Sequence, residues 1–137
     1  MEKYRFIDDL TSDVMFEAYG RDLKELFGNA AEAMFSVICQ LERVGQGESR
    51  EVTVSGKDGK DLLHNWLQEL IALVDTEGMF FSRFEIREIS PTGLKATVYG
   101  EEASAEKGET VVKAVTYYGF EFEKTKKGYR VRVSLDI

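Results

Sequence analysis

The sequence has one cysteine and one histidine, and this scarcity removes several classes of protein from consideration. A lone cysteine, Cys39, cannot form a disulfide or a cysteine zinc site within one chain. A lone histidine, His64, excludes a histidine metal cluster. Hydrolytic triads and histidine-dependent acid–base catalysis therefore have almost no material here, although a carboxylate-only mechanism stays open.

Long apolar runs are also missing. No stretch approaches the roughly 18–20 residues of a membrane-spanning helix, and the first residues lack the basic-then-apolar plan of a secretion signal. We therefore expect a cytoplasmic protein. The formal net charge of −7 argues against a chain that neutralises nucleic-acid phosphates over a broad surface. Any role in RNA chemistry should then depend on a partner protein, without direct nucleic-acid binding.

What the sequence does contain is typical of a globular protein. With 43% hydrophobic and 31% charged residues, it has enough apolar side chains for a core and is not of the disordered class. A length of 137 residues predicts one domain, residues 1–137.

The hydrophobic pattern predicts two helices, at about residues 22–41 and 60–74, each with a wide apolar face. Alternating or β-branched runs predict strands on either side of them. The order ββαβαββββ is α+β, because it lacks a regular βαβ repeat. We expect the helices to pack between two mostly antiparallel sheets as a β/α/β sandwich, or otherwise on one face of a single mixed sheet. The expected strands are residues 4–7, 14–19, 50–55, 79–89, 94–99, 111–123 and 129–135.

Aspartates gather in a short polar segment between the first two expected strands. Asp8, Asp9 and Asp13 lie there, and Asp136 stands beside the C-terminal Ile137. Carboxylate oxygens are the ligands that Ca²⁺ and Mg²⁺ prefer. The simpler interpretation is a turn shaped by Asp and Ser side chains and a frayed, solvated chain end. Residue chemistry alone leaves both interpretations open.

Four motifs, taken in their order and spacing, go further. They are Leu-Thr-Ser-Asp at 10–13, the helix segment 62–70 leading into Asp-Thr-Glu-Gly at 75–78, Val-Lys-Ala-Val-Thr-Tyr at 112–117, and the terminal Asp136-Ile137. Together they resemble the archease family over nearly the whole chain. Leu10, Gly108 and Tyr118 stand where that family usually carries histidine, which marks a departure from its pattern.

The resemblance implies a divalent-cation site, for Ca²⁺ or Mg²⁺, formed by Asp13, Asp136 and the backbone or terminal oxygens of Ile137. It also implies that Lys113 or Lys107 contacts phosphate or a partner. The plainer interpretation of each lysine is a solvated surface charge.

The function that the resemblance implies is non-enzymatic. Archeases are described as activators of the metal-dependent, GTP-using tRNA-splicing RNA ligase, and promote its guanylylation and repeated turnover. The alternative is a chaperone or specificity modulator of tRNA-modifying enzymes such as a tRNA methyltransferase. A metal-dependent hydrolase is a third possibility, but no nucleophile or distinctive general base accompanies the aspartates.

Overall fold

The computed structural model describes residues 2–8 and 13–137, and the expected order of helices and strands is confirmed. A short 3₁₀ helix, η1 (Leu41–Arg43), is added between the first helix and the third strand. The elements are β1 (Tyr4–Ile7), β2 (Val14–Gly20), α1 (Leu23–Ile38), β3 (Glu48–Ser55), α2 (Gly59–Glu77), β4 (Met79–Ser90), β5 (Gly93–Glu102), β6 (Ala114–Thr125) and β7 (Gly128–Asp136).

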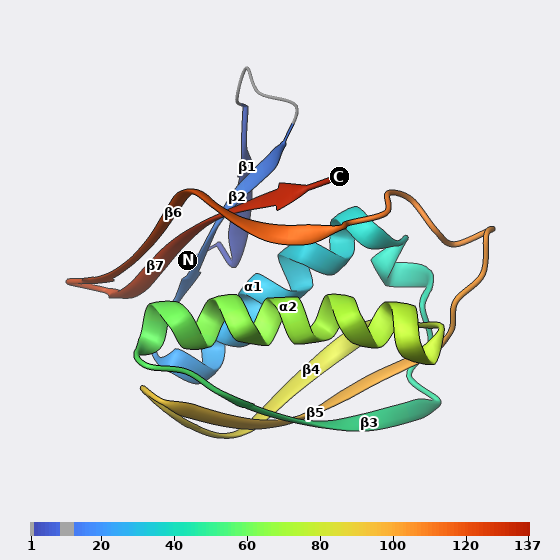
Figure 1. Cartoon of the computed structure of the whole chain (residues 1–137), viewed down its shortest axis with the longest axis horizontal. Helices are drawn as coiled ribbons and strands as arrows, with labels where there is room; N and C mark the ends of the chain where they lie inside the picture. Colours follow the sequence, from blue (N-terminus) through green and yellow to red (C-terminus); the bar gives the residue numbers. More distant parts are fainter. Residues whose placement is uncertain (1, 9–12) are drawn as a thin grey trace.

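The strands form two antiparallel sheets with the two helices between them (Figure 1). One sheet has the order β1-β2-β7-β6 and the other the order β3-β5-β4. Helix α1 contacts both β2 and β4, and α2 contacts β6, β3 and β4, so each helix touches both sheets. The predicted β/α/β sandwich is therefore confirmed, and the single mixed sheet is not found.

Both helices begin at an aspartate, whose side-chain oxygen can accept a hydrogen bond from a free N–H of the first turn. The side chain of Asp22 accepts a hydrogen bond from Glu25 N, and that of Asp58 accepts one from Asp61 N. Helix α2 ends at Gly78, which has φ +61 and donates to Val74 O. This left-handed conformation favours glycine because it brings a Cβ too close to the backbone.

Several predicted boundaries are wrong by three residues. Helix α2 ends at Glu77 and β5 at Glu102, each later than predicted. Helix α1 stops at Ile38, three residues early, because Cys39 is extended and forms an isolated β-bridge with Gly108. Strand β6 starts three residues late, at Ala114, because the preceding segment bonds to the end of α1 instead. Glu109 N donates to Ile38 O at 2.9 Å, and Thr110 N donates to Val37 O at 3.1 Å.

The core fills the space between the sheets and is built on large side chains from all three layers. Trp66 of α2 is fully buried, and its Nε1 donates to Phe27 O of α1 at 3.0 Å, which joins the helices. The other largest buried aromatic side chains are Phe16, Phe27, Phe35 and Phe81. None of the helices in the described part of the chain is long and apolar enough to cross a membrane.

Candidate functional site

The start of β2 and the end of β7 lie side by side in the four-stranded sheet. Val14 pairs with Leu135 at the end of the ladder. Asp13 precedes Val14 at a bend and Asp136 follows Leu135, so the two aspartates lie at the same end of this strand pair. The structure thus brings together two aspartates that are separated by nearly the whole sequence. In Figure 1, β7 ends on the side of the molecule where β2 begins.

Ser134 holds one of these aspartates in place. Its hydroxyl donates to Asp13 Oδ2 at 3.2 Å, and its side chain is fully buried. Ser134 lies two residues before Asp136 and therefore faces the same side of the sheet. Sequence reasoning missed this residue, and the only available signal was its two-residue spacing from Asp136.

The chain end could add further oxygen atoms. Ile137 follows Asp136 directly and is 40% exposed. Carboxylates close to one another repel, and a hard cation between them removes that repulsion. The donor set therefore fits Ca²⁺ or Mg²⁺, whose remaining positions carbonyl oxygens and water commonly fill.

Side chains alone do not complete such a site. Across residues 2–8 and 13–137, no three or more His, Cys, Asp and Glu side chains are grouped for a metal ion. The terminal oxygens of Ile137 would therefore be needed. Asp8 is exposed, and Asp9, Leu10, Thr11 and Ser12 lie outside the described residues.

The two lysines singled out by the sequence lie in different surroundings. Lys113 is exposed, and its backbone N–H donates to Asp136 O at 2.8 Å, so it lies beside the aspartate pair. Lys107 is half-buried, and its ammonium pairs with Glu101 at 2.6 Å. That carboxylate also accepts from Gly45 N at 3.0 Å. Only Lys113 is thus bonded to the aspartate site, and the phosphate role of either lysine stays a prediction.

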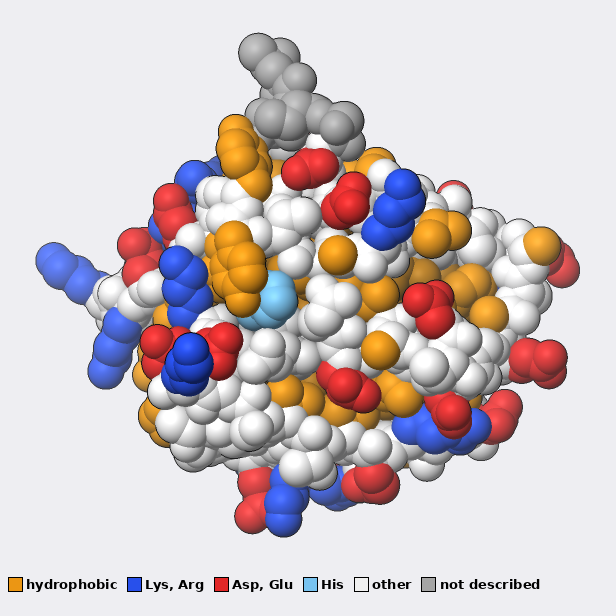
Figure 2. All heavy atoms as spheres, viewed as in Figure 1, with side chains coloured by type: hydrophobic (Ala, Val, Ile, Leu, Met, Phe, Trp, Pro, Cys, Tyr) orange, Lys and Arg blue, Asp and Glu red, His pale blue; other side chains and the backbone are white. Residues whose placement is uncertain are grey.

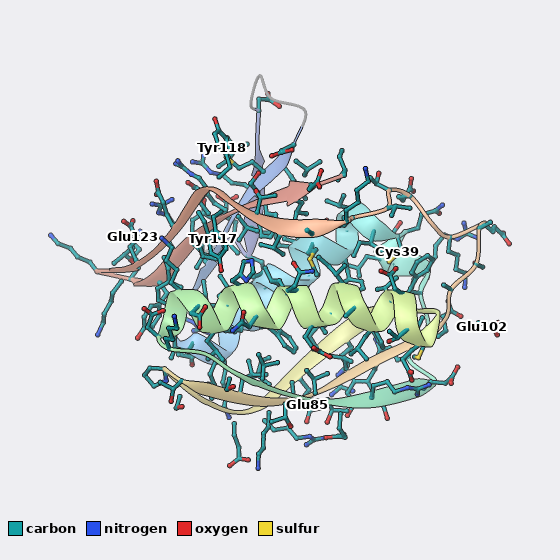
Figure 3. The ribbon with its side chains drawn as sticks, in the orientation of Figure 1. Cys39, Glu85, Glu102, Tyr117, Tyr118 and Glu123 are labelled. Carbon is teal, nitrogen blue, oxygen red and sulfur yellow. The ribbon has the colours of Figure 1, made fainter. Side chains whose placement is uncertain are left out.

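A bulge in β6 adds exposed aromatic side chains close to the site. Regular pairing with β7 is interrupted between Thr116 and Glu121, and Gly119 within the bulge has φ +62. The bulge exposes Tyr117 and Tyr118, which are 62% and 55% accessible. Figure 3 shows Tyr117 next to α2 and Tyr118 directed away from it. These tyrosines were not expected as functional residues from the sequence.

His64 supports this bulge from below. Its ring, on α2, is half-buried and stacks on Tyr117, with centroids 4.4 Å apart and planes 11° apart. Its Nε2 lies 3.1 Å from Val115 O. In Figure 2 the histidine lies directly beside an exposed hydrophobic side chain. His64 thus fixes the first tyrosine and the start of β6.

The single cysteine is not available as a nucleophile near neutral pH. Burial, followed by the nearby charges of Glu42 and Glu109, raises the pKa of Cys39 to about 12. Its Sγ donates to Phe35 O at 3.3 Å inside the core. The thiol is therefore protonated under ordinary conditions and serves packing.

The Archease protein family matches residues 4–137. An archease from Methanosarcina acetivorans is 39% identical over 142 residues, covering 99% of this chain and 97% of that protein. One from Archaeoglobus fulgidus is 39% identical over 137 residues, covering 98% and 99%.

Two solved structures share the fold. A protein from Methanobacterium thermoautotrophicum, solved in solution, has a TM-score of 0.84 and 35% identity, and the match covers 100% of both chains. The crystal structure of an archease from Thermotoga maritima, described as a possible chaperone, has a TM-score of 0.68 and 20% identity, covering 97% of both chains. The second likeness concerns the fold alone.

Proposed function

The chain belongs to the archease family, and on that premise we propose that it is a cytoplasmic, metal-binding activator of the GTP-dependent tRNA-splicing RNA ligase, not itself an enzyme. The observation that carries the proposal is the pairing of β2 with β7, which places Asp13 and Asp136 at the same end of these two strands. Ser134 of β7 donates to Asp13, and the chain end follows Asp136 directly. A helper protein that brings a cation to its partner needs such a site close to its surface.

The residues of the site have distinct tasks in this proposal. Asp13, Asp136 and the terminal oxygens of Ile137 would hold Ca²⁺ or Mg²⁺, and Ser134 orients Asp13 through its hydroxyl. When bound, the cation would neutralise phosphate charge while the ligase takes up its nucleotide. Lys113 can contact that phosphate because its side chain is exposed beside the site. Lys107 would first have to exchange its Glu101 partner.

In this proposal the protein docks on the ligase through the surface around the aspartate site. Tyrosine is enriched where protein interfaces carry most of their binding energy, and Tyr117 and Tyr118 are exposed on the bulge that follows Lys113. A net charge of −7 suits a basic, RNA-binding partner and steers the encounter.

A chaperone or specificity modulator, for instance of a tRNA methyltransferase, is the alternative. It would use exposed apolar surface and would tolerate loss of the aspartates. A cavity of about 290 Å³, whose lining includes Val74, Phe80 and Val111, favours it, since Val111 is 76% exposed. The Thermotoga archease that shares the fold is also described as a possible chaperone.

The test is multiple-turnover joining of a cyclic-phosphate RNA end to a 5′-hydroxyl end by the cognate ligase, with GTP and divalent metal. Substoichiometric amounts of this protein should increase the product formed per ligase molecule. The double variant Asp13→Asn/Asp136→Asn should lose this increase while keeping its circular dichroism spectrum. Asp75→Asn, the same change at an exposed aspartate of α2, serves as the control and should keep it.

An undiminished increase with the double variant would rule out the metal site as the working part and favour the chaperone alternative. No increase with the folded wild-type protein and an active ligase would overturn the activator proposal itself.

A further inference from the structure

Four lysines gather at one end of this acidic protein. A groove of about 660 Å³ runs between the β6–β7 hairpin, the start of α1 and the end of β4. We propose that this groove, called here the lysine groove, binds an acidic peptide segment that also carries apolar side chains. Its rim is formed by Lys24, Lys124, Lys126 and Lys127.

These four lysines are uncompensated. In the part of the chain that the structure describes, none has a carboxylate within ion-pair distance, and all four are exposed. The other two charges of the groove are already satisfied: Arg21 pairs with Glu25 at 3.0 Å, and Asp22 caps α1. The lysines therefore present net positive charge on a protein of net charge −7. Figure 2 shows basic side chains projecting at the end of the molecule where the β6–β7 hairpin of Figure 1 lies.

The floor of the lysine groove is apolar. Leu23 of α1, Ile89 of β4 and Tyr129 of β7 line it, and each is half-buried. A ligand with negative charge alone would leave this floor in contact with water. A peptide in which acidic and apolar side chains alternate satisfies both parts, because successive side chains of an extended peptide point to opposite sides.

The lining favours a peptide over single-stranded nucleic acid. Proteins that track single strands combine positive charge with aromatic rings on which bases stack. Tyr129 is the one aromatic ring among the described lining residues, and it is packed against Phe122, with centroids 6.1 Å apart. No exposed stacking surface is thus offered by that part of the groove.

The lysine groove is separate from the aspartate site. The two lie at opposite ends of β7, with Tyr129 beside the groove and Asp136 in the site. Seven residues of extended strand separate these positions by about 23 Å. A peptide bound in the lysine groove would therefore leave the aspartate site accessible. The inference rests on the proposed function in one respect only: it takes the peptide to be a segment of the protein that this chain assists.

The experiment is fluorescence anisotropy of a labelled peptide of alternating glutamate and leucine, with a polyglutamate peptide and a uridine oligonucleotide of equal charge as comparisons. We expect the glutamate–leucine peptide to bind most tightly. Charge reversal at the hairpin tip, Lys126→Glu/Lys127→Glu, should weaken its binding by at least about tenfold. Arg43→Glu/Arg50→Glu, which makes the same charge change outside the groove, should leave binding within about twofold of wild type.

Each alternative result is decisive. Tighter binding of the uridine oligonucleotide, lost in the hairpin variant, would replace the peptide with nucleic acid. If polyglutamate binds as tightly as the glutamate–leucine peptide, the apolar floor has no role in binding. If the lysine and arginine double variants lose the same affinity, the peptide does not bind in the lysine groove. Asp13→Asn/Asp136→Asn should bind the peptide like wild type, which separates failure of this inference from failure of the activator proposal.

Discussion

At the scale of single residues, Glu17 has crowded charged surroundings. It lies on the outer face of the four-stranded sheet, and yet its side chain is only 5% exposed. Arg130 and Arg132 approach Oε2 at 2.6 and 3.1 Å, and Arg5 and Tyr19 approach Oε1 at 3.2 and 2.9 Å. Burial by itself raises the pKa of Glu17, but hydrogen bonds from Tyr19 and Arg132 and the charge of Arg130 outweigh it, so the pKa is lowered.

The variant Glu17→Gln should therefore lower the free energy of unfolding at neutral pH, by about 2 kcal/mol. The lowered pKa means that the unfolded chain binds the proton more readily than the folded chain. The charged Glu17 side chain therefore stabilises the folded protein fully at pH values above 4.5, the ordinary pKa of glutamate. This stabilisation is lost as the pH falls through the lower pKa that Glu17 has in the folded protein. Urea unfolding between neutral and acid pH measures both effects.

The difference in unfolding free energy between wild type and Glu17→Gln should thus shrink as the pH falls below 4.5. A difference that stays constant with pH would show that lost packing, not the charge of Glu17, causes the destabilisation.

At the scale of elements, the C-terminal end of α2 depends on one glycine. Gly78 has φ +61, and apart from its own residue and its two chain neighbours no atom lies within 4 Å of the position a Cβ would take. Its carbonyl accepts from Ala103 N at 2.8 Å, so the same residue also fixes the exit from β5. Gly78→Ala should lower the unfolding free energy by about 1 kcal/mol, through backbone strain alone.

Gly47→Ala is the matched control, because a Cβ there also meets no atom and the backbone is outside the left-handed region. It should be neutral or slightly stabilising, since alanine restricts the unfolded chain. Thermal unfolding of both variants compares the two, and equal melting temperatures would contradict the role given to the conformation of Gly78.

The elements also show how far sequence patterns reach. Helix starts were predictable because Asp22 and Asp58 cap them through local contacts. The end of α1 was not, because Cys39 leaves the helix to pair with Gly108, which is distant in the sequence. The bulge of β6 was equally hidden, since the hydrophobic pattern of Tyr117 and Tyr118 reads as ordinary strand.

At the scale of the whole molecule, the layer arrangement followed from the sequence because both helices have wide apolar faces that need covering on two sides. Strand order did not, because it depends on pairing between β2 and β7 across the length of the chain. The same pairing places Asp13 and Asp136 at the same end of the two strands. The family resemblance of the motif at 10–13 and of the chain end suggested both aspartates, whereas Ser134 and the setting of His64 needed the fold.

The distribution of charge over the surface likewise becomes visible only once the fold is known. The net charge of −7 describes the average surface, while the lysine groove and the aspartate site lie at opposite ends of β7. A single sheet thus separates a positive surface from a negative one.

Isothermal titration calorimetry of Ca²⁺ into the metal-free protein tests whether Asp13 and Asp136 hold a cation. We expect one site, a loss of binding in Asp13→Asn/Asp136→Asn, and affinity about tenfold weaker in Ser134→Ala, where Asp13 loses its orienting hydroxyl. Asp75→Asn should bind like wild type. Calcium binding of undiminished affinity in the folded double variant would contradict the claim that these two aspartates hold the cation.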